Sequence, residues 1–448
     1  MCALSPRAGL HCVGVRSLIV YGQRVHFAGL GVALRRVNRN CKPMEHESML
    51  DDQPAGPLSG IRVLDLTSMI SGPVATMMLA DQGADVIKVE ALSGDLVRGA
   101  GPNRSGITAT FLSSNRSKRS LSLDLKSDAG SKILRDLIPT ADVFVQNFRP
   151  GTIERMGFGE DQVRALNNAM IYVSISGFGE QGPYAHQRVY DPVIQALSGL
   201  AAIQADGVTG RPKMIRTIIP DKTTALTAAQ AITAALFARE RTGEGQHVRL
   251  AMLDTMLAYL WPEGMAGFTL IGREVKAARA QLSPDLIFAT TDGYITAGAI
   301  SDKEWCGMCR ALDRESWLTD ARFKTLNDRA VNVTERLELT AEVIAGQSSE
   351  YWLARFDREG VPSAPVLDRE GVLEHEQIIA NQIIGEYEHP VAGKTRQPRP
   401  AALFDKTPAY IRRHAPSLGE HSEEILTELG YDAEQVGALL ASGVIRSV

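Results

Sequence analysis

The sequence predicts an α/β protein with a mostly parallel, doubly wound sheet and a second, smaller α+β region. Short β-branched runs alternate with helix-length stretches from Gly60 onward, and this alternation is typical of parallel sheets. Between residues 262 and 384 the pattern changes to Glu-, Arg- and Leu-rich helices that follow an Asp-Gly turn. With 44% hydrophobic and 22% charged residues, the composition is that of a globular protein and excludes disorder and coiled coil.

Strands and helices follow one another along the first half of the chain. Strands are expected at 61–67, 84–90, 118–125, 141–148 and 169–178. Helices are expected between the first two strands and from Asp128 to Thr140. In such Rossmann-like sheets, ligands bind at the carboxyl ends of the strands. The turn after the first strand, TSMISGPVA, lacks the G-x-G-x-x-G fingerprint and the chain has no P-loop, which disfavours nicotinamide and nucleoside-triphosphate enzymes.

Further elements are expected toward the C-terminus. An Ala-rich helix runs from Lys222 to Arg239, and a strand and a helix cover 247–260. Two strands pair around the Asp-Gly turn within 288–299. The second half of the chain therefore begins with a helix of the large sheet and continues into the smaller region.

The C-terminal part of the chain has a different composition. Residues 389–416 are Pro- and Arg-rich and are expected to be extended, and an amphipathic helix is expected at 422–430. The predicted divisions are a leader (1–57), the first part of a large domain (58–261), a linker with a small α+β domain (262–384) and a C-terminal segment that returns to the large domain (385–448).

The first 43 residues carry seven basic side chains and no acidic one. We interpret this leader as an upstream extension of an ordinary start at Met44 or Met49, with a mitochondrial presequence as the alternative. Only Cys306 and Cys309 lie outside it, so a disulfide framework is excluded and a reducing compartment is favoured, the cytoplasm or, with a presequence, the mitochondrial matrix. Cys306 and Cys309 lack a second pair of zinc ligands, and we expect them to pack on a helix without a metal.

Charge and hydropathy exclude two classes of partner. The formal charge of -4 gives no basic excess for nucleic acid. No run of eighteen apolar residues occurs, so a membrane is not an expected partner either.

Several segments, in order and spacing, resemble one known family. The N-terminal ones are GIRVLDLTSMISGPVATMMLADQGADVIKVE, SNRSKRSLSLDLK, ADVFVQNFRPGTIERMGFG and ISGFGEQGPYA. The likeness continues at RTGEGQHVRLAMLDTML, DGYITAG, GVPSAPV and APSLGEHSEEILTELGY. Together they resemble the family III CoA-transferases, the family of formyl-CoA transferase and carnitine CoA-transferase, which also contains the α-methylacyl-CoA racemases. The resemblance covers nearly all of residues 58–448.

This resemblance implies transfer of CoA from an acyl-CoA donor to a carboxylic acid through a covalent aspartyl-CoA intermediate. CoA and acyl-CoA would be substrates, with no permanently bound cofactor, and the chain would form an interlocked, ring-like homodimer. Two alternatives stay open: a 2-methylacyl-CoA racemase that acts by α-proton transfer, and a non-catalytic CoA-binding protein. Some relatives shield the intermediate with a glycine-rich loop, and no such run occurs between residues 255 and 300.

Asp221 falls where the family carries its catalytic aspartate. We expect it to follow a short apolar strand and to precede the Ala-rich helix, whose positive end would favour the charged carboxylate. Tyr190 is expected as a second catalytic residue. It stands where the racemases carry a proton-transferring histidine, and this difference favours transfer. Backbone N–H groups near Ser71 and Gly72 are expected to stabilise oxyanions.

Other positions are matched to the family's contacts with CoA. The residues expected to line the path to the thioester are Met69, Ile70 and Ser71. The residues matched to other CoA contacts are Leu123, Lys126, Asn147, Phe148, Arg155, Met156 and Arg188. Arginine and lysine suit the phosphates of CoA. Arg216 is a candidate partner for the distal carboxylate of a dicarboxylic substrate.

Overall fold

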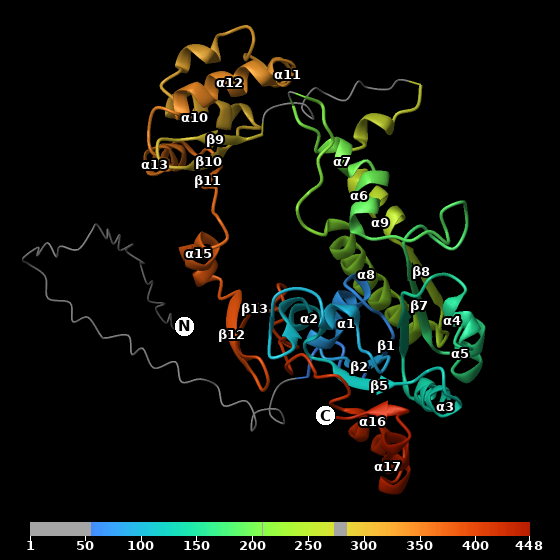
Figure 1. The fold of residues 1–448 in the computed structure, drawn as a ribbon. Coiled ribbons are helices and arrows are strands. Elements are labelled where there is room, and N and C mark those ends of the chain that lie inside the picture. Colours follow the sequence, from blue (N-terminus) through green and yellow to red (C-terminus); the bar gives the residue numbers. More distant parts are fainter. Residues whose placement is uncertain (1–54, 208, 273–284) are drawn as a thin grey trace, which may run out of the picture. The chain divides into compact units, whose positions relative to one another are not determined.

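A seven-stranded sheet is the main element of the computed structural model, which describes residues 55–207, 209–272 and 285–448 (Figure 1). The strand order is β14-β5-β2-β1-β6-β7-β8, and every strand except β14 runs parallel to its neighbours. The strands are β1 (Arg62–Asp65), β2 (Asp85–Glu90), β5 (Arg119–Leu123), β6 (Val143–Gln146), β7 (Ile171–Ser176), β8 (His247–Ala251) and β14 (Ile445–Arg446). The predicted parallel strands are thus confirmed, and the order switches direction between β1 and β6.

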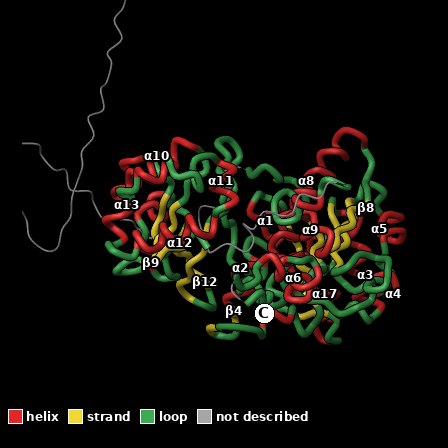
Figure 2. The backbone as a smooth tube through the Cα atoms, turned by 90° about the horizontal axis from the view of Figure 1, so that it is seen from above, coloured by secondary structure: helices red, strands yellow, loops and turns green. Residues whose placement is uncertain are grey.

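Helices cover both faces of this sheet, as Figure 2 shows by the red segments on either side of the strands. Adjacent residues of a strand point to opposite faces: Val63 packs in one core cluster and Leu64 in the other. The Val63 side is covered by α1 (Ser71–Asp81) and α8 (Ile219–Thr242). The Leu64 side is covered by α3 (Asp128–Leu137), α4 (Thr152–Arg155), α5 (Glu160–Leu166), α16 (Ser422–Glu428) and α17 (Ala433–Ala441). Because both faces are buried, the central strands carry apolar residues on both faces, as in VFV of β6 and IYV of β7.

The segment before α8 differs from the prediction. The described residues 209–218, which lead directly into the helix, contain no strand, and the helix begins at Ile219 rather than at Lys222. Pro220 lies in the first turn, where its fixed φ favours a helix and its missing N–H does no harm. Ile215, just before this segment, donates its backbone N–H to the side chain of Gln195. The apolar residues Ile218 and Ile219 therefore lead directly into α8 instead of forming a strand.

The smaller region contains a three-stranded antiparallel sheet in the order β11-β10-β9. Its strands are β9 (Ile287–Ala289), β10 (Tyr294–Ala297) and β11 (Ser363–Pro365). The predicted pair around the Asp-Gly turn is confirmed as β9 and β10. The helices packed with it are α10 (Asp302–Ala311), α12 (Val333–Ile344) and α13 (Ser349–Glu359).

Both described cysteines are free and lie on α10. Cys309 is buried in the core of the smaller region, and this burial raises the pKa of its thiol to about 12. A thiol held in this protonated form is a poor nucleophile. Among the described residues, no group of three His, Cys, Asp or Glu side chains is placed to hold a metal ion.

The C-terminal segment returns to the large sheet. Residues 389–416, which were expected to be extended, begin with part of an antiparallel hairpin of β12 (Ile384–His389) and β13 (Gly393–Pro398). The predicted helix is confirmed as α16, whereas α17 and β14 were not predicted. Strand β14 pairs with β5, so the end of the chain completes the edge of the sheet.

Short elements connect these parts. They are β3 (Asn103–Arg104), β4 (Ile107–Thr108), α2 (Ala109–Asn115), α6 (Asp191–Leu197), α7 (Leu200–Ile203), α9 (Met252–Leu260), α11 (Leu326–Val331), α14 (Gly371–Glu374) and α15 (Glu376–Ala380). No described helix is long and apolar enough to cross a membrane. Most of the leader and the part of 255–300 between 272 and 285 lie outside the described residues, so the expectations about a start residue and a glycine-rich loop are outside them too.

Candidate active site

The loop from β1 to α1 lies at the point where the strand order switches. Asn147, which directly follows β6, holds this loop from the neighbouring strand: its Oδ1 accepts a hydrogen bond from Ser68 N–H at 3.0 Å and its Nδ2 donates to Ser68 O at 2.8 Å. Met69 and Ile70 follow in the same loop and pack against a small apolar cluster. The structure thus brings four predicted site residues, Met69, Ile70, Ser71 and Asn147, to the carboxyl ends of β1 and β6, where open α/β sheets bind ligands.

Asp221 meets Ser71 at the starts of two packed helices. Ser71 is the first residue of α1 and Asp221 the third residue of α8, and the Ser71 hydroxyl donates a hydrogen bond to Asp221 Oδ1. The two helices contact each other through small residues such as Ala75 and Ala228, which permit a close approach. This packing on one face of the sheet places the two N-termini side by side.

Gly72 permits the tight start of α1. A Cβ atom at this position would lie 2.4 Å from Cβ of Thr67, closer than real side chains approach. Helix α1 has no side-chain cap at Ile70, and the backbone N–H of its first residue, Ser71, is a hydrogen-bond donor to the Asp221 carboxylate. An uncapped helix start is suited to an anionic group.

The environment of Asp221 differs from the prediction. Burial raises the pKa of its carboxyl above the ordinary value, the negative charge of Asp191 raises it further, and hydrogen bonds from Ser71 oppose the shift. The expectation that the helix end would favour the charged carboxylate is therefore wrong in direction, because desolvation and a like charge outweigh it.

Asp191 is a second buried carboxylate in this site. It is the first residue of α6 and is 2% exposed, and its Oδ2 accepts a hydrogen bond from the backbone N–H of Asp221 at 3.2 Å. Sequence reasoning singled out the neighbouring Tyr190 and missed Asp191. The available signal was an Asp-Pro pair, which is common at a helix start.

Gln195 ties the segment before α8 to this carboxylate. Its Nε2 donates to Asp191 Oδ1 at 2.6 Å, and its Oε1 accepts from Ile215 N–H at 3.0 Å. Nε2 also lies 3.3 Å from the carbonyl oxygen of Thr217. Arg216 lies between these two anchored residues, and its side chain is exposed. Sequence reasoning missed Gln195, because nothing in the pattern shows which side chain a loop backbone bonds.

Tyr190 lies at the N-cap position of α6 next to Asp191, and this residue is 62% exposed. A shallow apolar cavity of about 510 Å³ lies on the same helix. Its lining consists of Tyr184, Pro192, Val193, Ala196, Leu197 and Met214.

The residues matched to CoA contacts divide into three groups. Arg155 and Arg188 are exposed, as is Lys126 just after β5. Phe148 and Met156 are half-buried against the core cluster. Leu123 is fully buried inside β5, so the structure does not bring its side chain to a ligand surface.

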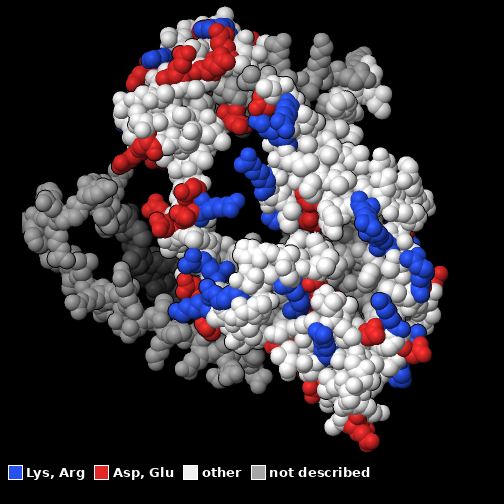
Figure 3. Space-filling view, in the orientation of Figure 1, with Lys and Arg blue, Asp and Glu red and all other residues white. Residues whose placement is uncertain are grey.

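Basic side chains do not form one continuous patch on the face drawn in Figure 3, where they are separated by uncharged and acidic surface. Arg155 donates one guanidinium hydrogen bond to Thr152 Oγ1 at 3.1 Å. In the described part of the chain, neither Arg155 nor Arg188 hydrogen bonds to Ser71 or Asp221.

A cluster of buried charges lies beneath the β1–α1 loop. Asp65, the last residue of β1, forms an ion pair with Lys118 at 2.8 Å, and neither side chain is exposed. Lys88 forms a second buried pair with Asp95 at 3.0 Å. The lysine within the apolar run DVIKVE was a visible signal for such a cluster, because a fully buried lysine requires a partner.

Comparison with known proteins gives consistent results. The sequence model of one protein family, described as CoA-transferase family III, matches residues 58–422. Human succinyl-CoA:glutarate CoA-transferase is 36% identical over 398 residues, which cover 87% of this chain and 90% of the human protein. Formyl-CoA:oxalate CoA-transferase of Streptomyces coelicolor is 32% identical and is covered over 100% of its length, with 87% of this chain.

Solved structures agree with the sequence matches. The crystal structure of a CAIB/BAIF family protein from Brucella suis superimposes with a TM-score of 0.72 at 30% sequence identity. The superposition covers 84% of this chain and 100% of the other.

Proposed function

The chain belongs to CoA-transferase family III, and from this membership we propose that Asp221 carries CoA between two carboxylic acids as a covalent adduct. The chain is an acyl-CoA:carboxylate CoA-transferase, as are its relatives. The role of Asp221 is supported by one observation above all: its carboxylate accepts a hydrogen bond from Ser71 where two helix starts meet at the switch point of the sheet.

The proposed reaction consists of two exchanges. The Asp221 carboxylate attacks the thioester carbonyl of the donor, the C–S bond breaks, and an acyl-aspartyl anhydride and CoA thiolate form. The thiolate then attacks the aspartyl carbonyl, which releases the donor acid and leaves an aspartyl-CoA thioester. The acceptor carboxylate attacks this thioester, and the thiolate is released and attacks the acceptor carbonyl of the new anhydride. The product acyl-CoA and the free Asp221 carboxylate result.

The surroundings of Asp221 suit these steps. The Ser71 hydroxyl and the uncapped N–H groups at the start of α1 would donate to the oxyanions that form at the aspartyl carbonyl. Because burial raises the pKa of Asp221, its carboxylate is more basic than an exposed one, and a more basic carboxylate is a better nucleophile. Burial also limits the access of water to the anhydride.

The CoA site is proposed to extend from this pair along the carboxyl edge of the sheet. Met69, Ile70 and Ser71 would line the thioester, with Asn147 and Phe148 beside them after β6. Lys126, Arg155, Met156 and Arg188 would contact the rest of CoA, with the cations on its phosphates. Leu123 would contribute only to the core beneath the site. Tyr190 would border the acyl group.

The pH dependence tests the role of Asp191. The nucleophile must be ionised, so adduct formation is expected to fall as the pH drops through the raised pKa of Asp221. In an Asp191→Asn variant the like charge is absent, so the acidic limb of the pH–rate profile is expected to move to lower pH. Single-turnover rates across the acidic range measure this. A limb that stays in place or moves to higher pH would contradict the assignment.

We propose dicarboxylic acids as the acyl groups. Both acids named for the similar human enzyme are dicarboxylic, as is the oxalate named for the Streptomyces enzyme. Arg216 offers an exposed cation beside the backbone anchored by Gln195. An Arg216→Ala variant is expected to raise KM for dicarboxylic acceptors about 10-fold or more, because a charge-assisted pair is lost. KM for monocarboxylic acids of equal length is expected to stay unchanged. Steady-state assays with pairs of dicarboxylic and monocarboxylic acids of equal length measure the two KM values. An equal change of KM for both classes would exclude a role of Arg216 in binding the distal carboxylate.

The oligomeric state, the domain boundaries and the compartment are proposed together with this function. The chain would form an interlocked homodimer with a Rossmann-like large domain (58–261 and 385–448) and a small domain within 262–384, and light scattering of the purified protein tests the dimer. The cytoplasm is the proposed compartment, with the mitochondrial matrix as the alternative, and cell fractionation distinguishes them.

One experiment tests the activity. The protein is incubated with a donor such as succinyl-CoA and a panel of acids, and mass spectrometry detects new CoA esters. A second incubation in D₂O, without an acceptor acid, separates transfer from racemisation. A racemase exchanges the α-proton of the acyl-CoA for deuterium under these conditions, whereas a CoA-transferase is expected to leave the acyl-CoA without deuterium. Absence of any new CoA ester across the panel would contradict the proposal.

A further inference from the structure

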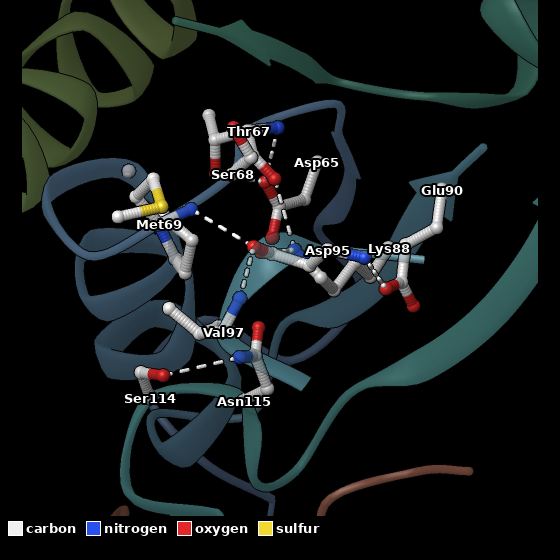
Figure 4. Close-up of polar contacts among 12 residues, drawn as sticks. Asp65, Thr67, Ser68, Met69, Lys88, Glu90, Asp95, Val97, Ser114 and Asn115 are labelled. Atoms are coloured by element: carbon white, nitrogen blue, oxygen red, sulfur yellow. Dashed lines mark hydrogen bonds and ion pairs between the residues drawn. The ribbon is translucent and has the colours of Figure 1, made fainter. Parts of the chain in front are cut away.

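Three consecutive residues of the β1–α1 loop are each held by a different side chain. Thr67 N–H donates to Asp65 Oδ1 at 2.9 Å, and Ser68 N–H donates to Asn147 Oδ1 at 3.0 Å. Met69 N–H donates to Asp95 Oδ1 at 3.1 Å, a contact drawn in Figure 4. The three acceptors come from the end of β1, from the residue after β6 and from the residue before a short 3-10 turn at 96–98. The path of the loop is therefore fixed residue by residue.

Asp95 is itself held on all sides. Its Oδ1 also accepts from Val97 N–H at 3.2 Å, and its backbone N–H donates to Glu90 Oε1 at 3.0 Å. Its Oδ2 accepts from Lys88 Nζ at 3.0 Å, and the same Nζ donates to the carbonyl oxygen of Thr67 at 2.9 Å (Figure 4). Asp95 is 6% exposed and Lys88 is 0% exposed. The lysine thus joins the carboxylate to the start of the loop in one buried unit.

Met69 requires such support. Its φ is +68°, in the left-handed region that is unfavourable for a residue other than glycine. This conformation turns the chain from β1 into α1, and Ser71 follows two residues later. A loop that relaxed at Met69 would move the hydroxyl of Ser71, which donates to Asp221.

We propose that Asp95, held by Lys88, is a positioning residue for the reaction at Asp221. It fixes the left-handed turn at Met69 and thereby sets the position of Ser71 against the reacting carboxylate. In the described part of the chain Asp95 has no hydrogen bond to Ser71 or Asp221, so it acts through the loop. The inference rests on the proposed role of Asp221.

The test measures the rate of adduct formation in a single turnover, with the covalent CoA adduct detected by mass spectrometry. Asp95→Ala is expected to slow adduct formation about 100-fold, because a displacement of about 1 Å in a reacting group has an effect of that size. KM for acyl-CoA is expected to change much less than kcat. Asp95→Asn keeps an acceptor oxygen for Met69 N–H but loses the charge that faces Lys88, and a smaller loss of about 10-fold is expected.

Asp81 provides a matched control. It is also a buried aspartate, and it lies on α1, the helix that begins at Ser71. It lies at the far end of α1, is 3% exposed, and forms a buried ion pair with Arg116 at 2.9 Å. Asp81→Asn is expected to lower the denaturation midpoint and to leave the rate of adduct formation of the folded protein unchanged. A purely structural role for Asp95 would give the same pattern as this control.

The outcomes are distinct. Wild-type adduct rates in both Asp95 variants would overturn the inference, as would an equal slowing by Asp81→Asn. Should Asp95→Ala not fold, the near-isosteric Asp95→Asn decides alone. Asp221→Asn is measured in parallel: full turnover in that variant would refute the proposed function itself, whatever the Asp95 variants show.

Discussion

Asp221→Asn is expected to abolish CoA transfer, with kcat about 10⁴-fold lower or more, because an amide does not attack a thioester and no aspartyl-CoA can form. The asparagine keeps the size of the side chain and can still accept a hydrogen bond from the Ser71 hydroxyl, so the fold is expected to persist. The measurement is the rate of appearance of the acceptor's CoA ester. Hydroxylamine treatment of the wild-type enzyme during turnover is expected to modify Asp221, and the variant is expected to show no modification.

Asp254 supplies the control for this experiment. It is the third residue of α9, as Asp221 is the third residue of α8, but its side chain is exposed. Asp254→Asn is expected to retain wild-type turnover. Turnover in Asp221→Asn at the rate of this control would contradict the covalent mechanism.

The largest effect on stability is expected from the buried pair of Asp65 and Lys118. Lys118 Nζ lies 2.8 Å from Asp65 Oδ2, 2.8 Å from the carbonyl oxygen of Pro73 and 2.9 Å from Asn115 Oδ1. Lys118→Met removes all three contacts and leaves a carboxylate that is 0% exposed without its nearest cation. Loss of one partner of such a pair lowers the free energy of unfolding by about 3–5 kcal/mol. Urea denaturation followed by circular dichroism measures the change.

Two further variants separate the possible causes. Lys132 forms an exposed pair with Asp136, and Lys132→Met is expected to leave the denaturation midpoint almost unchanged. In a Lys118→Met, Asp65→Asn double variant the unpaired charge is absent, so part of the lost stability is expected to return. An equal midpoint for Lys118→Met and Lys132→Met would show that the buried pair contributes little.

The sequence predicted the parallel sheet because its signal is local and repeated. Runs such as 84–90 and 141–148 carry apolar residues on both faces, and a strand covered by helices on both sides needs that pattern. The hairpin of β12 and β13 and the edge strand β14 were missed for the opposite reason. Their residues are polar and exposed in large part, so cross-strand pairing, which sequence does not reveal, decides their structure.

The site was predictable only in part. The resemblance to the family identified Asp221, and the loop after the first strand was expected to hold a ligand from sheet topology alone. Asp191 and Gln195 were missed because their function depends on which backbone groups they meet. The predicted effect on the pKa of Asp221 was opposite to the shift in the structure. Reasoning from the local sequence includes the helix end, but it includes neither burial nor the charge of Asp191, which lies thirty residues away in the chain.

The placement of β14 has a consequence for the folding of the protein. Its two residues lie far from β5 in the sequence, and they cover the outer edge of β5. Until β14 has docked, β5 is the uncovered edge strand of the sheet. An uncovered edge readily pairs with strands of other chains. Folding intermediates in which β14 has not yet paired with β5 are therefore the species most exposed to aggregation.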